Sequence, residues 1–169
     1  MIQWYKLEMP LASLFISDQQ LMKQTTPLHI LLADDDNDDT FLFQEALEQI
    51  PILTRLDIAE NGIELMETLK GYVVTPDLIF LDMNMPVKNG LECLQELRRS
   101  DIYKETPVVI LSTSVAGYLL EDAYNAGANL YIQKPTSFSN LVTILKKCLL
   151  KKSNLSNRPD LSEFLIANE

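Results

Sequence analysis

The chain has 169 residues, 24 of them acidic and 14 basic, and a formal net charge of −10 at pH 7. This excess of negative charge argues against direct binding to nucleic acid, whose phosphates would repel the protein. The length suffices for one domain with a sizeable core, and no segment resembles a membrane-spanning helix or a signal peptide, so we expect a cytoplasmic protein without a membrane partner.

Residues 1–26 show no clear hydrophobic period. They are either an N-terminal extension that packs elsewhere or a mis-assigned start, with the true first residue at Met22. Both interpretations place the beginning of the folded domain at residue 27.

From residue 27 to residue 152, short apolar runs alternate with segments of helical periodicity. Strands are predicted at 29–33, 53–59, 77–81, 107–111 and 129–133, and helices at 40–49, 62–70, 91–99, 119–125 and 138–150. Strict alternation at these lengths is typical of an α/β fold in which a parallel sheet carries helices on both faces. Cys93 and Cys148 fall on inward helical positions without metal-binding spacing, so we expect buried, reduced thiols.

Residues 153–169 begin with polar residues and then place Leu161, Phe164 and Leu165 at helical spacing. This pattern predicts a C-terminal tail that contains one short amphipathic helix. The helix would dock either on the domain or on a partner, and a homodimer that uses the tail is one of the alternatives.

Five acids follow the first predicted strand within six residues, from Asp34 to Asp39. Such a cluster repels itself unless water or a cation neutralises it. Asp38 or Asp39 is predicted to cap the helix that begins at Thr40, where an acid also favours the positive helix end. Capping does not account for Asp34 and Asp35, which directly follow the strand.

A calcium-binding EF-hand loop is a second interpretation of these acids. Asp34, Asp36, Asp38 and Glu45 fall at positions one, three, five and twelve of that loop. However, Asp39 replaces the glycine required at position six, and a strand rather than a helix precedes the loop. We therefore do not favour calcium binding of this kind.

The third, fourth and fifth predicted strands also end in residues that carry chemistry, namely Asp82, Ser112 and Lys134. Because the carboxyl ends of parallel strands share one edge of the sheet, we expect these side chains to meet Asp34 and Asp35 there. Carboxylate oxygens suit Mg²⁺. A carboxylate with a metal ion, an ammonium and a hydroxyl nearby can accept a phosphoryl group as an aspartyl phosphate.

Four motifs together resemble those of response-regulator receiver domains, and in particular the stand-alone chemotaxis type of two-component signalling. They are Ile30-Leu31-Leu32-Ala33-Asp34-Asp35-Asp36, Leu81-Asp82-Met83-Asn84-Met85-Pro86 with Gly90, Leu111-Ser112-Thr113-Ser114, and Tyr131-Ile132-Gln133-Lys134-Pro135. The resemblance covers residues 29–152. It implies a flavodoxin-like (βα)5 fold with a doubly wound five-stranded sheet in the order 2-1-3-4-5.

The resemblance also implies how the acids at the sheet edge divide their roles. Asp82 would be the phosphoacceptor, Asp35 would bind Mg²⁺ directly, and Asp34 would act on the metal largely through water. The backbone carbonyl of Asn84 would complete the metal site.

The remaining roles implied by the resemblance concern the phosphorylated state. Lys134 and Ser112 would contact the phosphoryl group, and Ser112 and Tyr131 would move as a switch that changes the surface of the fourth helix, fifth strand and fifth helix. Asn84 and Ser114 match the variable positions that tune the lifetime of the phosphoryl group.

A histidine kinase or a histidine phosphotransfer protein is the phosphodonor that the resemblance implies, with an unknown downstream protein as target and a monomer or homodimer as the assembly. We expect no enzyme activity beyond self-phosphorylation and slow autodephosphorylation. An aspartate-nucleophile phosphohydrolase is the alternative, but Asn84 replaces the general acid that such enzymes need two residues after the nucleophile. A flavin-binding protein would need a loop rich in Gly, Ser and Thr after the first strand, where this chain has acids.

Overall fold

The computed structural model describes residues 26–151, 155 and 157–167. Its strands are all parallel and comprise β1 (Leu28–Ala33), β2 (Thr54–Ala59), β3 (Leu78–Asp82), β4 (Val108–Ser112), β5 (Leu130–Gln133) and β6 (Leu165–Ile166). Its helices are α2 (Asn37–Glu48), α3 (Gly62–Lys70), α4 (Gly90–Arg99), α5 (Gly117–Asn125), α6 (Phe138–Leu150) and α8 (Leu161–Phe164). Within these ranges, no helix has the length and apolar character of a membrane span.

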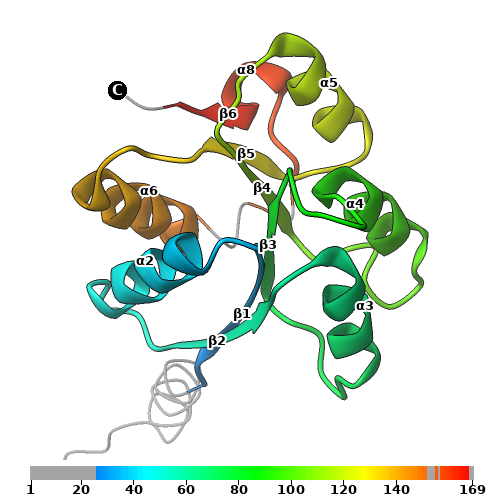
Figure 1. The fold of residues 1–169 in the computed structure, drawn as a ribbon, viewed down its shortest axis with the longest axis horizontal. Coiled ribbons are helices and arrows are strands. Elements are labelled where there is room, and N and C mark those ends of the chain that lie inside the picture. The colour runs from blue at the N-terminus through cyan, green and yellow to red at the C-terminus, as the bar shows by residue number, and fades with distance from the viewer. Residues whose placement is uncertain (1–25, 152–154, 156, 168–169) are drawn as a thin grey trace, which may run out of the picture.

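The six strands form one sheet in the order β2-β1-β3-β4-β5-β6. Helices α2 and α6 cover one face of the sheet, and α3, α4 and α5 cover the other (Figure 1). The predicted doubly wound parallel sheet with the order 2-1-3-4-5 is therefore confirmed. Strand β6 is an addition that the sequence did not predict, and it comes from the C-terminal tail. The two interpretations of residues 1–26 lie outside the described residues, except for residue 26.

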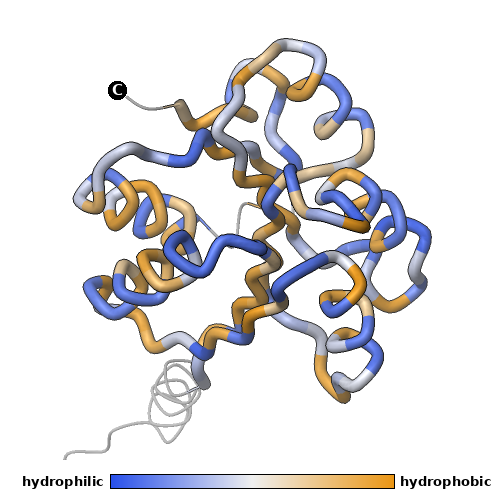
Figure 2. Tube along the Cα trace, in the orientation of Figure 1, coloured by the Kyte–Doolittle hydropathy of each residue, from blue (hydrophilic) through white to orange (hydrophobic). Residues whose placement is uncertain are grey.

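Alternate residues of the central strands supply two apolar cores. Ile79 and Leu81 of β3 pack with residues of α3 and α4, whereas Leu78 and Phe80 pack with residues of α2 and α6. Strands β3 and β4 are buried along their whole length, which accounts for their continuous apolar sequences. Figure 2 shows hydrophobic residues along the sheet and on the helix sides that face it.

The two cysteines are free and buried, one in each core. Burial raises the pKa of the Cys93 thiol to about 11 and that of the Cys148 thiol to about 12. Both thiols are therefore protonated at neutral pH and contribute to the cores as small apolar groups.

Helix α2 begins three residues earlier than the sequence pattern predicts. Its N-cap is Asp36, whose carboxylate accepts hydrogen bonds from the backbone amides of Asp38 and Asp39. The prediction that Asp38 or Asp39 caps the helix at Thr40 is therefore wrong. Because the helix starts at Asn37, both acids already lie in its first turn, where their charge favours the positive helix end.

A polar network joins β1 and β2 to the segment that follows α3. Asp57 accepts hydrogen bonds from Arg55 at 2.9 Å and from the Tyr72 hydroxyl at 2.5 Å, and its carboxylate lies 2.9 Å from Nε2 of His29. The rings of His29 and Tyr72 pack edge to face with centroids 4.9 Å apart. Partial burial opposes ionisation of Asp57, but these three hydrogen bonds outweigh it and lower the pKa below the ordinary 3.8.

Asp57→Asn is expected to lower the free energy of unfolding at pH 7 by about 1–3 kcal/mol, because three donors lose a charged acceptor. A carboxylate with a lowered pKa stabilises the fold above the unfolded value near 3.8 and loses this effect as the pH falls through the folded value. Urea unfolding at neutral pH and below pH 3 should therefore show a difference between wild type and variant that shrinks in acid. A difference that stays constant with pH would contradict this account.

Candidate functional site

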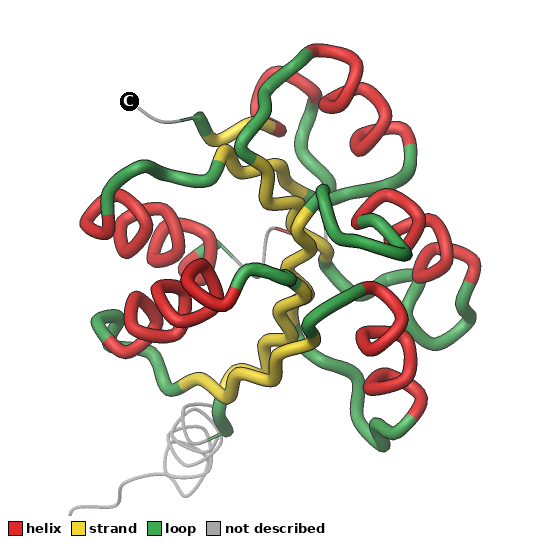
Figure 3. Tube along the Cα trace, in the orientation of Figure 1, coloured by secondary structure: helices red, strands yellow, loops and turns green. Residues whose placement is uncertain are grey.

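The carboxyl ends of β1, β3, β4 and β5 meet at one edge of the sheet, where each strand passes into a loop (Figure 3). The parallel register places Asp82 opposite Leu111 and Ser112 opposite Gln133. The backbone amide of Lys134 donates to the carbonyl of Ser112 at 2.8 Å, which extends the pairing past the end of β5. These backbone hydrogen bonds therefore fix the backbone positions from which the side chains at this edge extend.

Lys134 lies among three carboxylates at this edge. Its Nζ atom is 2.8 Å from Oδ2 of Asp34, 2.8 Å from Oδ1 of Asp82 and 2.7 Å from Oδ2 of Asp39. Burial by itself would lower the pKa of Lys134, but the three hydrogen bonds outweigh it and raise the pKa above the ordinary lysine value. Lys134 is therefore a charged ammonium that joins β5 to β1, β3 and α2.

Asp34 is almost completely buried beside this ammonium, with 3% of its surface exposed. Burial raises the pKa of Asp34 even though Lys134 and the backbone amide of Asp36 donate hydrogen bonds to its carboxylate. Repulsion from Asp82 adds to this rise. The single positive charge of Lys134 also faces three carboxylates. The cluster therefore has an excess of negative charge that favours a further cation.

The donor set at this edge fits a divalent cation. Carboxylate oxygens of Asp34, Asp35 and Asp82 lie within 4.8 Å of one another, and Asp35 is exposed. Asp35 and Asn84 also line a surface depression of about 550 Å³ beside the carboxylates. Oxygen donors with an open side suit a cation such as Mg²⁺, which retains several waters.

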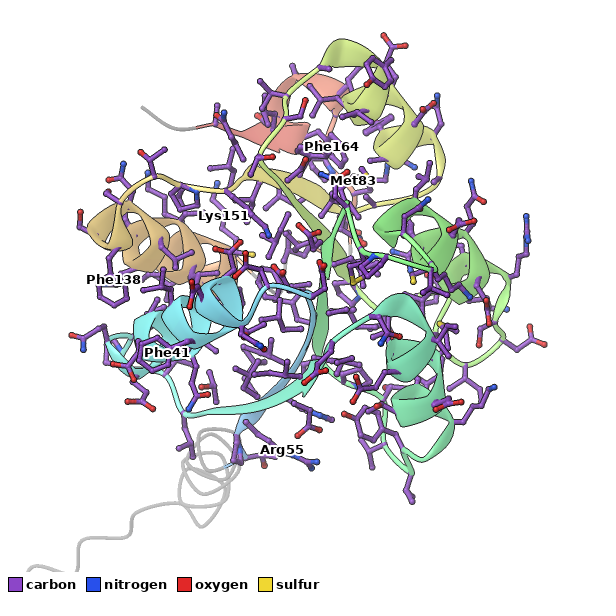
Figure 4. The ribbon with its side chains drawn as sticks, in the orientation of Figure 1. Phe41, Arg55, Met83, Phe138, Lys151 and Phe164 are labelled. Carbon is purple, nitrogen blue, oxygen red and sulfur yellow. The ribbon has the colours of Figure 1, made fainter. Side chains whose placement is uncertain are left out.

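The loop after β3 holds Asp82 in place. The backbone amide of Asn84 donates to Oδ2 of Asp82 at 2.8 Å, while Oδ1 faces Lys134. The amide of Gly90 donates to the carbonyl of Met83, the residue that marks this end of β3 in Figure 4. A Cβ atom at position 90 would collide with the carbonyl oxygen of Asp82, so only glycine permits this close approach.

The hydroxyl side of the site is formed by the end of β4 and by β5. Ser112 is completely buried, and its Oγ accepts a hydrogen bond from the amide of Ser114 at 3.2 Å. The hydroxyl of Tyr131 donates to the carbonyl of Ser114 at 2.8 Å. Burial raises the pKa of Tyr131, so its hydroxyl remains a neutral donor.

The structure brings most of the residues singled out in the sequence to the edge formed by the carboxyl ends of the strands. Asp34, Asp35, Asp82 and Lys134 form the charged cluster. The side chain of Ser114 accepts a hydrogen bond from the amide of Ala116 at 3.3 Å and so supports the start of α5.

Asp39 is the site residue that sequence reasoning missed, because it was interpreted as a helix cap. Its contact with Lys134 follows from the earlier start of α2, which changes the direction of every side chain in the first turn. The available signal in the sequence was Asp36 itself, because aspartate is a preferred residue at the position directly before a helix.

Comparisons with known proteins agree with this geometry. The family model of the response regulator receiver domain matches residues 30–146. Response regulator Rcp1 of Synechocystis sp. is 32% identical over 125 residues, which are 71% of this chain and 85% of that protein.

Two solved structures extend the likeness to three dimensions. The crystal structure of the phosphorylated cyanobacterial phytochrome response regulator RcpA has a TM-score of 0.71 and 31% identity, over 80% of this chain and all of that chain. The crystal structure of the Mn²⁺-bound form of response regulator Rcp1 has a TM-score of 0.67 and 30% identity, over 78% of this chain and 96% of that chain.

Lys134→Met is expected to lower the free energy of unfolding in EDTA by about 2–4 kcal/mol, because the buried carboxylates of Asp34 and Asp82 lose their ammonium partner. Added Mg²⁺ should stabilise this variant more than the wild type, since the cation replaces the missing positive charge. Lys104→Met is the matched control, because Lys104 is half exposed and pairs only loosely with exposed Asp101. A loss that Mg²⁺ leaves unchanged would contradict the shared-charge arrangement.

Gly90→Ala is expected to displace the loop after β3 and to destabilise the fold by about 1–3 kcal/mol, because the new methyl group meets backbone rather than a flexible side chain. Gly117→Ala is the control, since nothing lies within 4 Å of a Cβ atom at that position in α5. Thermal unfolding should separate the two variants, with the control equal to the wild type or slightly more stable. Equal stability of both variants would argue against the close approach at residue 90.

Proposed function

The chain belongs to the response regulator receiver family, and we propose that Asp82 is its phosphoacceptor, with a phosphohistidine of a histidine kinase or histidine phosphotransfer protein as donor. The observation that carries the proposal is the 2.8 Å contact between Nζ of Lys134 and Oδ1 of Asp82 beside Asp34 and Asp35. It joins a strand-end carboxylate, an ammonium and metal-type oxygen donors in one place.

The residues of this chain have defined parts in the transfer. A carboxylate oxygen of Asp82 attacks phosphorus, the bond from phosphorus to the histidine nitrogen breaks, and the released imidazole takes up a proton. The backbone amide of Asn84, 2.8 Å from Oδ2, fixes the orientation of the carboxylate. Lys134 and the hydroxyl of Ser112 stabilise the negative charge on the phosphoryl oxygens.

Asp34, Asp35, Asp82 and the backbone carbonyl of Asn84 are the proposed ligands of Mg²⁺. When bound, the cation would neutralise charge on the carboxylates and on the phosphoryl oxygens. The excess negative charge around Lys134 and the Mn²⁺-bound form described for the relative Rcp1 support this part of the proposal.

Signalling is proposed to pass from the phosphoryl group through Ser112 and Tyr131 to a protein partner, with Asn84 and Ser114 tuning the phosphoryl lifetime. Residues 27–152 would form the receiver domain and residues 153–169 a C-terminal tail. The net charge of −10 favours a protein target over nucleic acid or a membrane surface. We propose that the protein is cytoplasmic and acts as a monomer or a homodimer.

An aspartate-nucleophile phosphohydrolase is not favoured. The family match and the amide at Asn84, in place of a proton-donating acid two residues after Asp82, both oppose it. The chemistry proposed for the chain itself is phosphotransfer to Asp82 and slow autodephosphorylation.

Incubation with a small phosphodonor and Mg²⁺ is expected to add one acid-stable, base-labile phosphate to the wild type and none to Asp82→Asn. EDTA should suppress the reaction, since the carboxylates then repel the donor. Asp101→Asn is the control, because it removes an acid that is almost fully exposed on the chain's surface. Intact-mass spectrometry measures the added phosphate, and phosphorylation of Asp82→Asn would refute the assignment.

A further inference from the structure

The C-terminal segment, comprising residues 155 and 157–167, returns across the outer edge of β5. Strand β6 pairs in parallel with β5, with Leu165 opposite Tyr131 and Ile166 opposite Ile132. Figure 1 shows α8 and β6, in red, beside β5 and near α5. The segment therefore lies along β5, the strand that carries the proposed switch residue Tyr131.

Phe164 is the apolar anchor of the C-terminal segment. It is 1% exposed, and its ring centroid lies 5.1 Å from that of Tyr124 in α5 and 6.1 Å from that of Tyr131 in β5. Figure 4 shows Phe164 on the C-terminal segment, next to the sheet. An aromatic side chain buried this deeply contributes substantially to docking, through apolar area and through the edge-to-face ring contact.

Polar contacts fix the same segment at two further points. The guanidinium of Arg158 lies 3.6 Å from the ring centroid of Tyr124, whose hydroxyl donates to the carbonyl of Pro159 at 3.3 Å. The side-chain amide of buried Asn129 donates to the carbonyl of Leu155 at 2.6 Å. The C-terminal segment thus has a specific docked position on the α5 and β5 side of the domain.

On its inner side, Tyr131 connects directly to the site. Its hydroxyl donates to the carbonyl of Ser114, and the amide of Ser114 donates to Oγ of Ser112. Tyr131 is completely buried, held at its tip by Ser114 and contacted on its ring by Phe164. A continuous series of contacts therefore joins Phe164 to the hydroxyl that is proposed to bind the phosphoryl group.

We propose that Phe164 is a positioning residue for the phosphorylation site, and that the docked C-terminal segment strengthens phosphoryl binding by keeping Tyr131 buried. The inference rests on the proposed function of Asp82. Withdrawal of Phe164 frees the ring of Tyr131 to turn outward, and the Ser114 loop then loses the bond that holds it beside Ser112. A less organised hydroxyl binds more weakly, because ordering it costs part of the binding free energy.

The coupling must also act in reverse. If docking of the C-terminal segment raises phosphoryl affinity, a bound phosphoryl group must tighten docking by the same factor. The output of the domain would then include a change in how firmly residues 157–167 cover β5.

Titration of beryllium fluoride, a phosphoryl analogue, in the presence of Mg²⁺ tests the inference. Phe164→Ala is expected to bind the analogue about five- to twentyfold more weakly than the wild type, which is within the usual range of coupling between sites. In a Tyr131→Ala background, Phe164→Ala should cause little further weakening, because its effect passes through Tyr131. Equal affinity of wild type and Phe164→Ala, or the same loss in both backgrounds, would overturn the inference.

Matched variants separate positioning from general destabilisation. Leu161→Ala removes a half-exposed side chain of the same segment and should leave the affinity unchanged, whereas Phe164→Leu should recover much of it. If Phe164→Ala does not fold, hydrogen exchange of the wild type decides. Amides of residues 161–167 should exchange more slowly with beryllium fluoride and Mg²⁺ than with Mg²⁺ alone, and unchanged exchange would overturn the inference.

Failure of this inference is distinguishable from failure of the proposed function. If the wild type neither binds beryllium fluoride nor gains an Asp82-dependent phosphate, the proposed function is wrong. If the wild type does both and Phe164→Ala behaves identically, only the role of Phe164 is wrong.

Discussion

The site depends on one ammonium that three carboxylates share. Lys134 contacts Asp34 and Asp82, which are both nearly buried, and Asp39, which is partly exposed. Neighbouring carboxylates without a counter-charge would repel each other strongly at this distance. A single lysine therefore offsets part of this repulsion, yet it leaves enough negative charge to attract a metal ion.

The sheet makes this arrangement possible, because Asp34 and Lys134 lie 100 residues apart in the chain. Parallel strands point their carboxyl ends the same way, and their ladder fixes those ends to within the length of a hydrogen bond. The loops then set the details, as when Gly90 lies against the backbone of Asp82 and the amide of Asn84 orients its carboxylate. The sheet therefore sets the positions of the charged residues, and the loops set the orientation of their side chains.

The aromatic contacts extend the site toward the edge of the sheet. Tyr131 bonds to the loop that contains Ser114 on one side and packs against Phe164 on the other. Because β6 covers the edge of β5, the C-terminal segment protects backbone groups that would otherwise be open to another strand. Packing at Phe164 is thus connected to the hydroxyl of Ser112 through Tyr131 and Ser114.

The sequence by itself determined the alternation of strands and helices and the residues at the strand ends, namely Asp34, Asp35, Asp82, Ser112 and Lys134. These features have local signals, since a buried strand is a continuous apolar run and the residue after it is easily identified. The order of the first five strands was implied by the resemblance to receiver domains. Only the tertiary structure decided that Asp39 contacts Lys134 and that β6 and Phe164 cover β5. Each of these contacts depends on a partner far away in the chain, which the spacing of neighbouring residues does not encode.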